Sequence, residues 1–367
     1  MPTSTPAPQP ATIDVAFPAP AAAVQLVKNH IRSLDFLRAV AALSVCLYHF
    51  SGVTLPKSTN VYLQPLFAYG WVGVDIFFVI SGFIIPYSLL GKNHQISNFG
   101  PYIAKRIIRI NPPAYVAMGL VLVQRLLIDY VINHNRVYTG SLSGGQLLHN
   151  LLFTIPFTHY QWVVGIFWTL AIEFQFYIFI GLFFTFLFER DGIWSFMVGY
   201  LLANALQYLP FSDSANFFHF SPMFALGGAT LLFYQNRLGW WLYGLVMLLF
   251  AGLAYWQLGL PIAAVGVATA LSILWLKVEN KWLVLLGRMS YSFYLVHALI
   301  GTTCEFVLIR IIAPNTEGKK VTITLLCLVG ALVGAYVFYV LIEKPFIGLA
   351  RKYGNGPAAG KRAIADA

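Results

Sequence analysis

Two ionisable residues that could take part in chemistry lie on one apolar stretch near the start of the chain. The stretch Leu34 to Phe50 reads LDFLRAVAALSVCLYHF and carries Arg38 and His49, with ten residues between them. Eleven steps of about 100° come within roughly 20° of three helical turns, so both side chains share one helix face, about 16 Å apart. If this stretch spans a membrane, both residues are functional candidates, because a charge that faces lipid costs about 3 kcal/mol or more.

Three more ionisable residues fall inside later apolar stretches, namely Asp75 in GWVGVDIFFVISGF, Glu173 in FWTLAIEFQFY and His297 in LGRMSYSFYLVH. Counted at about 1.5 Å per residue, these residues and His49 lie between the middle of the membrane and its outer third. A histidine exchanges a proton near neutral pH, and Glu173 is suited to orient an imidazole or to stabilise its protonated form. Taken singly, each residue also has an ordinary interpretation as a hydrogen-bonded core residue or a partner of a neighbouring helix.

The composition is that of an integral membrane protein. Hydrophobic residues make up 59% and charged residues 10% of the 367 residues, and the mean hydropathy is +0.72. A soluble domain carries about 25% charged residues. The net charge of +10 does not indicate a nucleic-acid partner, because the basic residues lie at the ends of apolar stretches. Cys46, Cys304 and Cys327 lie inside apolar stretches without metal-ligand spacing, so we expect buried thiols and no metal site.

The sequence predicts an all-α fold, a polytopic integral membrane helix bundle with about ten transmembrane helices of about 20 residues each. The expected spans are 34–52, 70–90, 110–132, 162–188, 194–209, 217–234, 239–257, 260–277, 285–312 and 321–346. Residues 1–30 are predicted to be a disordered cytoplasmic tail, residues 31–347 the transmembrane domain and residues 348–367 a second cytoplasmic tail. No internal repeat is visible, which argues modestly against a transporter built from inverted repeats.

Basic residues decide the predicted orientation. One side of the membrane collects most of them, among them Arg38, Lys105, Arg106, Arg109 and Arg288. Because an excess of lysine and arginine marks the cytoplasmic side, we expect both termini in the cytoplasm. The arginines then form a basic vestibule on the cytoplasmic side of the layer that holds the histidines and carboxylates.

Acid–base groups inside a membrane fit more than one kind of protein. A base that removes the proton of a hydroxyl as it attacks a carbonyl would serve acyl transfer. A histidine–carboxylate relay would serve a proton-coupled transporter, and a transporter of a lipid-linked sugar is a related alternative. A structural membrane protein is the third class, and it predicts that the intramembrane charges can be neutralised without loss of function. Spacing alone does not choose among these classes.

The order of the motifs resembles the acyltransferase 3 family of membrane O-acyltransferases over about residues 31–347. The motifs that carry the resemblance are Arg-x10-His at 38–49, GVDIFFVISGF at 73–83, RxxR at 106–109, WTLAIEFQFY at 168–177, LGRMSYSFYLVH at 286–297 and EKPF at 343–346. Many members of that family have two adjacent acidic residues where this chain has Glu173 followed by Phe174. We therefore assign the role that the resemblance gives to this acidic pair to Glu173 alone.

The resemblance implies an enzyme, an O-acyltransferase that transfers groups other than amino-acyl groups. Such enzymes move an acyl group, usually acetyl, from cytoplasmic acyl-CoA to a hydroxyl of a carbohydrate or glycolipid, such as an envelope or exported polysaccharide. The implied location is the bacterial cytoplasmic (inner) membrane, and the implied partners are acetyl-CoA or another acyl-CoA, the carbohydrate acceptor and membrane lipids. The sequence names neither the acceptor, nor the acyl group, nor the oligomeric state.

The resemblance also assigns roles to the ionisable residues. The catalytic residues would be His49, Glu173 and Asp75, and the substrate-binding residues would be Arg38, Arg106, Arg109 and His297. In these roles His49 is a general base or a transient acyl carrier. The arginines bind the phosphates of coenzyme A through charge-assisted hydrogen bonds.

Overall fold

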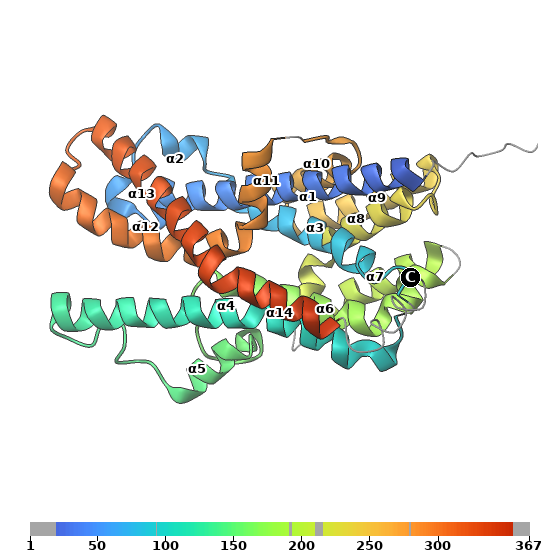
Figure 1. Ribbon diagram of the computed structural model, residues 1–367, viewed down its shortest axis with the longest axis horizontal. Helices are drawn as coiled ribbons and strands as arrows, with labels where there is room; N and C mark the ends of the chain where they lie inside the picture. Colours follow the sequence, from blue (N-terminus) through green and yellow to red (C-terminus); the bar gives the residue numbers. More distant parts are fainter. Residues whose placement is uncertain (1–19, 93, 191–192, 210–215, 279, 355–367) are drawn as a thin grey trace, which may run out of the picture.

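A computed structural model of the chain describes residues 20–92, 94–190, 193–209, 216–278 and 280–354. Within these ranges the elements are helices and no strand is present. Most helix axes run along the longest dimension of the molecule (Figure 1). The α-helices are α1 (Pro20–Tyr48), α2 (Leu63–Leu66), α3 (Gly73–Tyr87), α4 (Phe99–Leu127), α5 (Gly144–Leu151), α6 (Phe167–Phe184), α7 (Ile193–Ala205), α8 (Phe217–Tyr234), α9 (Trp240–Leu258), α10 (Leu260–Trp275), α11 (Lys281–Arg288), α12 (Ser290–Ile312), α13 (Glu317–Phe338) and α14 (Lys344–Gly354).

Among the described residues, 8 helical segments are long and apolar enough to cross a membrane. They are Ser33–Val53, Leu63–Tyr87, Ile96–Ile132, Phe167–Glu189, Phe217–Tyr234, Trp240–Leu258, Ser290–Ile312 and Glu317–Tyr353. The two other predicted spans, 194–209 and 260–277, correspond to the shorter helices α7 of 13 residues and α10 of 16 residues. The all-α multi-pass architecture is therefore confirmed, and the count of about ten spans stays a prediction.

The first helix begins earlier than the predicted end of the N-terminal tail. α1 starts at Pro20 and continues through an alanine run. Proline is favourable in the first turn of a helix and alanine has the highest helix propensity, so this segment is helical where a disordered tail was expected up to residue 30. Residues 1–19 of the predicted tail lie outside the described residues. At the other end α14 reaches Gly354, and residues 355–367 also lie outside them.

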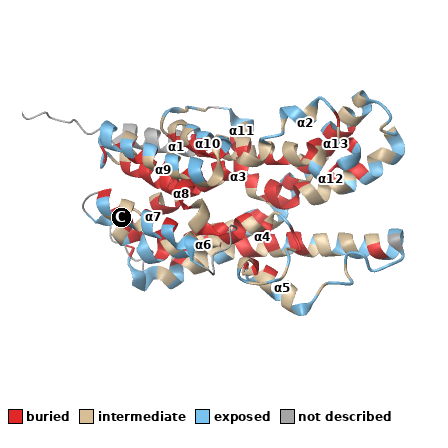
Figure 2. Cartoon of the chain, turned by 180° about the vertical axis from the view of Figure 1, so that it is seen from behind, coloured by how far each residue is buried: buried red, intermediate tan, exposed pale blue. Residues whose placement is uncertain are grey.

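Buried apolar side chains form two clusters. Figure 2 shows in red where the buried residues lie along the helices. One includes side chains of α3, α8, α9 and α10, and the other includes side chains of α1, α4, α12 and α13. α3 and α8 meet backbone to backbone at Gly82 and Gly227. A Cβ on Gly82 would collide with the Phe224 carbonyl, and one on Gly227 would collide with the Val79 carbonyl. Such close approach between membrane helices requires small residues at the contact.

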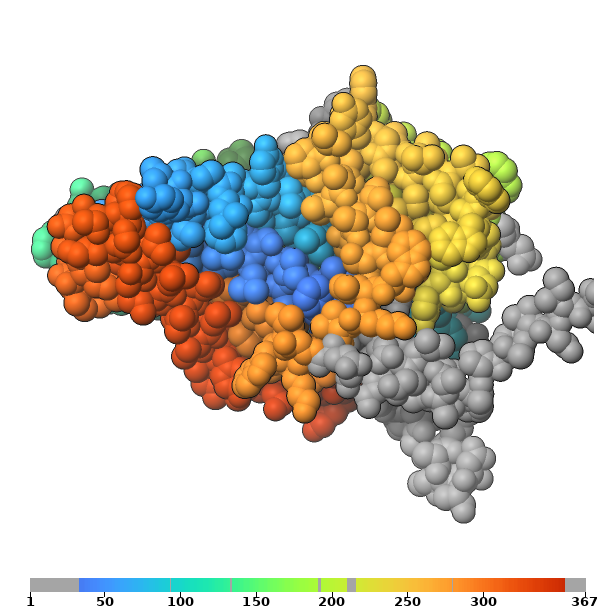
Figure 3. Space-filling view, turned by 90° about the horizontal axis from the view of Figure 1, so that it is seen from above, coloured from blue at the N-terminus to red at the C-terminus, as the bar shows by residue number. Residues whose placement is uncertain are grey.

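The loop that follows α1 is fastened to helices from the other end of the chain. Ser58 donates from its amide and its hydroxyl to the Glu305 carboxylate of α12, at 2.9 and 2.7 Å. The amide of Val61 donates to Glu317 of α13 at 3.1 Å. Figure 3 shows this early part of the chain in blue beside the orange and red of α12 and α13. These bonds hold the segment that comes directly after His49.

Candidate active site

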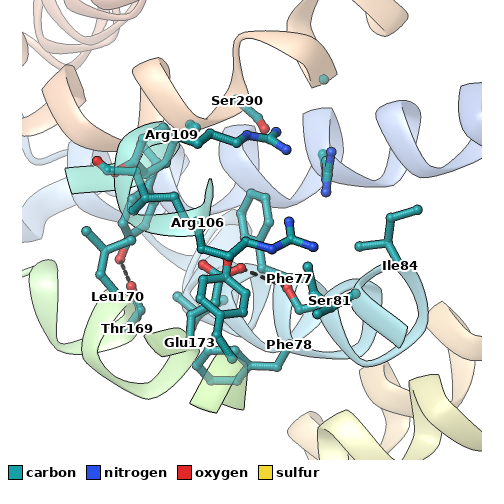
Figure 4. A pocket seen from close by; sticks show the side chains of 18 of the residues that line it. Phe77, Phe78, Ser81, Ile84, Arg106, Arg109, Thr169, Leu170, Glu173 and Ser290 are labelled. Atoms are coloured by element: carbon teal, nitrogen blue, oxygen red, sulfur yellow. Dashed lines mark hydrogen bonds between the residues drawn. The ribbon is translucent and has the colours of Figure 1, made fainter. Parts of the chain in front are cut away.

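One cavity between the helices is lined by several arginines, and we call it the arginine cavity. It has a volume of about 250 Å³. Its charged lining residues are Arg38 of α1, Arg106 and Arg109 of α4, Glu173 of α6, Arg288 of α11 and Glu343. Figure 4 shows Arg106 and Arg109 reaching into it from α4, with Glu173 nearby on α6. With all of these groups ionised, four guanidinium groups outnumber two carboxylates, and the cavity is positively charged.

Contacts with neighbouring side chains orient two of the arginines, Arg106 and Arg288. Arg106 donates to the Ser88 hydroxyl at 2.9 Å, and its guanidinium lies over the rings of Tyr102 and Tyr177 at 5.5 and 5.4 Å. Arg288 Nε lies 3.6 Å from an Asp35 carboxylate oxygen. A planar, oriented guanidinium is well suited to bind phosphate oxygens in pairs.

Positive charge extends beyond the arginine cavity to Lys92, which is close enough to Lys105 and Arg106 to feel their charges. Lys92 lies in the turn after α3, outside the membrane-spanning segments. Partial burial lowers the pKa of its ammonium group, and the neighbouring charges of Lys105 and Arg106 lower it further. Repulsion between like charges is therefore present before any ligand arrives, and an anion bound here would relieve it.

The second cavity, which we call the histidine cavity, is larger and mostly apolar. It has a volume of about 670 Å³. Its residues with polar or aromatic side chains include Tyr48, His49, Thr54, Trp71, Asp75, Trp168, His219, Phe220, Gln257 and Tyr294. No arginine or lysine of the described chain lines this cavity. A ligand held here would meet aromatic faces and a few polar groups, the usual make-up of a small-molecule site.

The chain geometry after α1 sets the position of His49. α1 ends at Tyr48, and a π-helical turn, His49–Val53, follows it. The wider turn brings Thr54 back onto His49, where the Thr54 hydroxyl lies 3.1 Å from Nδ1 and the Thr54 amide donates to the His49 carbonyl at 2.7 Å. Gly52 has φ +154° within this turn, a conformation that residues with a side chain rarely adopt. In the tautomer in which Nδ1–H donates to the Thr54 hydroxyl, Nε2 keeps the lone pair that a base needs.

His297 lies behind His49 and not in a cavity. Its side chain is buried at 1% exposure, and its ring centroid lies 5.3 Å from that of His49. Nδ1 donates to the Tyr294 carbonyl at 2.7 Å, while Nε2 has no hydrogen-bond partner. His297 is not among the lining residues of either cavity, so the substrate-binding role that the sequence assigns to it stays a prediction. The structure places it where it can position the His49 ring.

The predicted layer of histidines and carboxylates divides between the two cavities. His49 and Asp75 line the histidine cavity, whereas Glu173 lines the arginine cavity. There Glu173 accepts a hydrogen bond from the Ser81 hydroxyl at 3.0 Å. Glu173 and His49 thus line different cavities, and the expectation that Glu173 orients an imidazole stays a prediction. Depth along each helix was predicted from the sequence, but the rotation and packing of α6 decide which cavity its carboxylate enters.

The predicted basic vestibule, in contrast, is brought together. Arg38, Arg106, Arg109 and Arg288 all line the arginine cavity, and Lys105 does not. Arg38 and the start of the turn at His49 belong to one continuous helical segment, so this segment contributes a residue to each cavity.

The two cavities meet at Val74 and Tyr294, which line both of them. The Tyr294 hydroxyl donates to the Ile166 carbonyl at 2.9 Å and lies 2.8 Å from the Thr169 hydroxyl. These contacts join α12 to the start of α6. The Tyr294 side chain, held by these contacts, therefore lies between the arginine cavity and the histidine cavity.

Sequence reasoning missed two polar residues of the histidine cavity, His219 of α8 and Gln257 of α9. His219 offers no usable signal in the sequence, because nothing in its neighbourhood indicates which helix it faces. Gln257 offers a weak signal, since an amide near the end of a long apolar helix must find polar partners. It finds them in Asn204 of α7, with which it exchanges hydrogen bonds of 2.8 and 3.1 Å.

Comparison with known proteins decides the family. The acyltransferase domain model of the acyltransferase 3 family matches residues 31–340. The chain belongs to this family. The resemblance inferred from the ordered motifs is confirmed, and the two cavities described above both lie within or directly beside the matched residues.

Individual relatives carry names of the same kind. "Peptidoglycan O-acetyltransferase OatA" of Listeria monocytogenes is 28% identical over 159 residues, which is 41% of this chain and 24% of that protein. "Putative peptidoglycan O-acetyltransferase YrhL" of Bacillus subtilis is 34% identical over 158 residues, 41% of this chain and 23% of that protein. The chain thus spans about a quarter of the length of these relatives. "Putative acetyltransferase ORF330" of Acidianus two-tailed virus is 26% identical over 300 residues, 74% of this chain and 84% of that protein. No solved structure matches the chain.

Proposed function

We propose that this protein is a membrane O-acyltransferase that moves an acyl group, in the first place acetyl, from acyl-CoA to a hydroxyl of a carbohydrate acceptor. One observation carries the proposal: a positively charged cavity and a histidine-lined cavity meet at a single junction, Val74 and Tyr294. Coenzyme A is a polyanion and a sugar hydroxyl is neutral, so each substrate fits one of the two cavities. Family membership and the peptidoglycan O-acetyltransferase names of relatives support a glycan acceptor.

The donor belongs in the arginine cavity. Arg38, Arg106 and Arg109 are suited to bind its phosphates, with Arg288 at the edge of the same cavity. The acyl end of the donor then approaches the junction at Tyr294. Glu173 and Glu343 lie among these arginines, and they limit the positive charge of the cavity.

His49 is the general base in this proposal. Its Nε2 takes the proton of the acceptor hydroxyl as the hydroxyl oxygen attacks the thioester carbon. The tetrahedral intermediate collapses, the carbon–sulfur bond breaks, and the coenzyme A sulfur leaves with the proton that His49 returns. The Thr54 hydroxyl, 3.1 Å from Nδ1, orients the ring, and His297 packs against it. If His49 is instead a transient acyl carrier, its Nε2 attacks the thioester carbon, the carbon–sulfur bond breaks and the coenzyme A thiolate leaves. The acceptor hydroxyl then attacks the acyl carbon, the bond from Nε2 to that carbon breaks, and the hydroxyl proton passes to the thiolate.

The membrane arrangement is part of the same proposal. We place the protein in the cytoplasmic (inner) membrane with both termini in the cytoplasm, because the basic residues collect on that side. The arginine cavity then faces the compartment that contains acyl-CoA. The histidine cavity lies toward the opposite side, where an envelope or exported polysaccharide is assembled.

A transfer assay with membranes tests the proposal. Membranes that contain the wild-type protein, given acetyl-CoA labelled in the acetyl group, should place base-labile label on glycan, and His49→Ala should abolish this. His159→Ala is the matched control, because His159 is exposed and lines neither cavity. Absence of labelled glycan with the wild-type protein, or full labelling with His49→Ala at equal protein levels, would contradict the proposal.

A further inference from the structure

We infer that the histidine cavity is the acceptor subsite and that it selects a neutral sugar unit through the aromatic and polar residues that line it together with His49. This inference rests on the proposed acyl transfer and extends it to the class of the acceptor. The residues that form the recognition wall are Trp71, Asp75, Trp168, His219, Phe220 and Gln257, all of which line the cavity. None of the polar side chains on α8 and α9 has a part in the chemistry assigned to His49.

Aromatic rings provide the flat part of this wall. Trp168 of α6 and Phe220 of α8 lie with ring centroids 5.8 Å apart, and Phe78 packs behind them at 6.5 and 5.3 Å. Trp71, in the short turn before α3, adds a third half-buried ring to the cavity lining. A sugar ring has an apolar face of C–H groups, and broad rigid aromatic surfaces bind such faces at little conformational cost.

Two polar side chains are held in fixed orientations beside the rings. Gln257 exchanges hydrogen bonds with buried Asn204, which leaves one N–H and one lone pair of its amide for a ligand. His219 Nδ1 lies 2.9 Å from Gln207 Oε1, so His219 presents Nε2 as an acceptor. Each hydroxyl of a sugar both donates and accepts, and this pairing of donor and acceptor matches it.

Asp75 supplies the strongest sign that a ligand belongs here. Its side chain is only 3% exposed and lines the histidine cavity, yet Oδ1 has no hydrogen-bond partner. An unsatisfied buried carboxylate oxygen costs free energy of the order of 1–3 kcal/mol. A hydroxyl of the bound acceptor would donate to Oδ1 and remove that cost. Asp75 is then a positioning residue that holds the sugar near His49.

Charge decides between neutral and anionic sugars. An acidic sugar would bring its carboxylate or phosphate beside Asp75, and no arginine or lysine of the described chain lines the cavity to compensate. The arginine cavity, in contrast, is lined by four arginines and is suited to an anionic ligand. The acceptor unit that enters the histidine cavity is therefore neutral.

The test measures acetyl transfer to extracted glycan over a range of glycan concentrations. Trp168→Ala and Gln257→Ala should each raise the KM for the glycan at least about fivefold while the KM for acetyl-CoA stays at the wild-type value. Trp168→Phe keeps an aromatic face and should restore most of the affinity. Trp241→Ala and Gln95→Ala are matched controls, because both side chains are exposed and line neither cavity. A thermal melt of each purified variant confirms folding.

A second measurement identifies the acceptor unit. Glycan labelled by the wild-type protein is digested with glycosidases, and the labelled units are separated by anion exchange. Label on neutral units supports the inference, and label only on acidic units overturns it. Wild-type glycan KM in both Trp168→Ala and Gln257→Ala overturns the subsite while leaving acyl transfer intact. Absence of any His49-dependent label means that the proposed function itself has failed.

Discussion

The two cavities of this protein differ in charge, in size and in how their polar groups are paired. The arginine cavity has a volume of about 250 Å³ and four arginines, and several of its charged groups already contact protein partners. The histidine cavity has about 670 Å³ and no basic side chain other than histidine among the described residues. Asp75 Oδ1 in its wall is unsatisfied. Under the proposed function, the arginine cavity takes the charged donor and the histidine cavity takes the neutral acceptor.

Because of this difference, the proposed donor binding and the proposed acceptor binding can be tested by separate substitutions. A change in the arginine cavity should alter donor binding, and a change in the histidine cavity should alter transfer or acceptor binding. The junction at Val74 and Tyr294 is the place where the two effects should mix.

The largest effect is expected for His49→Ala. Loss of a general base costs about 100-fold or more in rate, while the affinity for acetyl-CoA should stay unchanged because His49 lines the other cavity. Acetyl transfer to glycan and calorimetric binding of acetyl-CoA to the purified protein measure the two quantities. A loss of acetyl-CoA binding equal to the loss of transfer would show that the cavities do not have separate roles.

Arg106→Ala should weaken acetyl-CoA binding about tenfold to a hundredfold, because a hydrogen bond to a charged group contributes about 1.5–3 kcal/mol. Part of this loss comes from the contacts that hold Arg106 over Tyr102 and Tyr177. Calorimetry at two salt concentrations measures the affinity. Arg310→Ala is the control, since Arg310 is exposed near the end of α12 and lines neither cavity. Equal affinities in the two variants would remove the donor from the arginine cavity.

Glu173→Gln tests whether the arginine cavity takes part in proton transfer, because Glu173 lines that cavity and not the one that His49 lines. Removal of one negative charge from that cavity should lower the KM for acetyl-CoA by about threefold, and the pH dependence of kcat should keep its wild-type form. Steady-state kinetics at several pH values measure both. A loss of kcat as large as that of His49→Ala, with an altered pH profile, would instead place Glu173 in the proton-transfer chemistry.

The smallest effect is expected for Tyr294→Phe at the junction. The variant loses the hydrogen bond to the Ile166 carbonyl and the contact with Thr169, which should lower the free energy of unfolding by about 1 kcal/mol. It should also raise the rate with butyryl-CoA relative to acetyl-CoA, because the side chain between the two cavities is less firmly held. Thermal unfolding and the ratio of the two rates test this. Tyr255→Phe, at an exposed position of α9, is the control.

Much of the fold could be predicted from the sequence, because long apolar stretches in a membrane have little choice but to be helices. The expected spans overlap the observed helices, but several boundaries differ. α1 starts early, at Pro20, α4 starts at Phe99 and not near residue 110, and the span expected over 285–312 is divided between α11 and α12. The vestibule of Arg38, Arg106, Arg109 and Arg288 was also predicted correctly. All four were assigned to the same side of the membrane from the sequence, so depth alone was enough to group them, although Lys105, which was assigned there too, does not line the cavity.

An apolar helix bundle, a helical segment shared by Arg38 and His49, and the ordered motifs of the acyltransferase 3 family could be read from the amino-acid sequence. Which polar groups face one another depended on how the helices pack. This packing separated Glu173 from His49, buried His297 behind the cavity wall, and brought His219 and Gln257 into it. The periodicity of a sequence indicates how deep a residue lies in the membrane and on which face of its helix. The residues that contact this face depend on how helices far apart in the chain pack together.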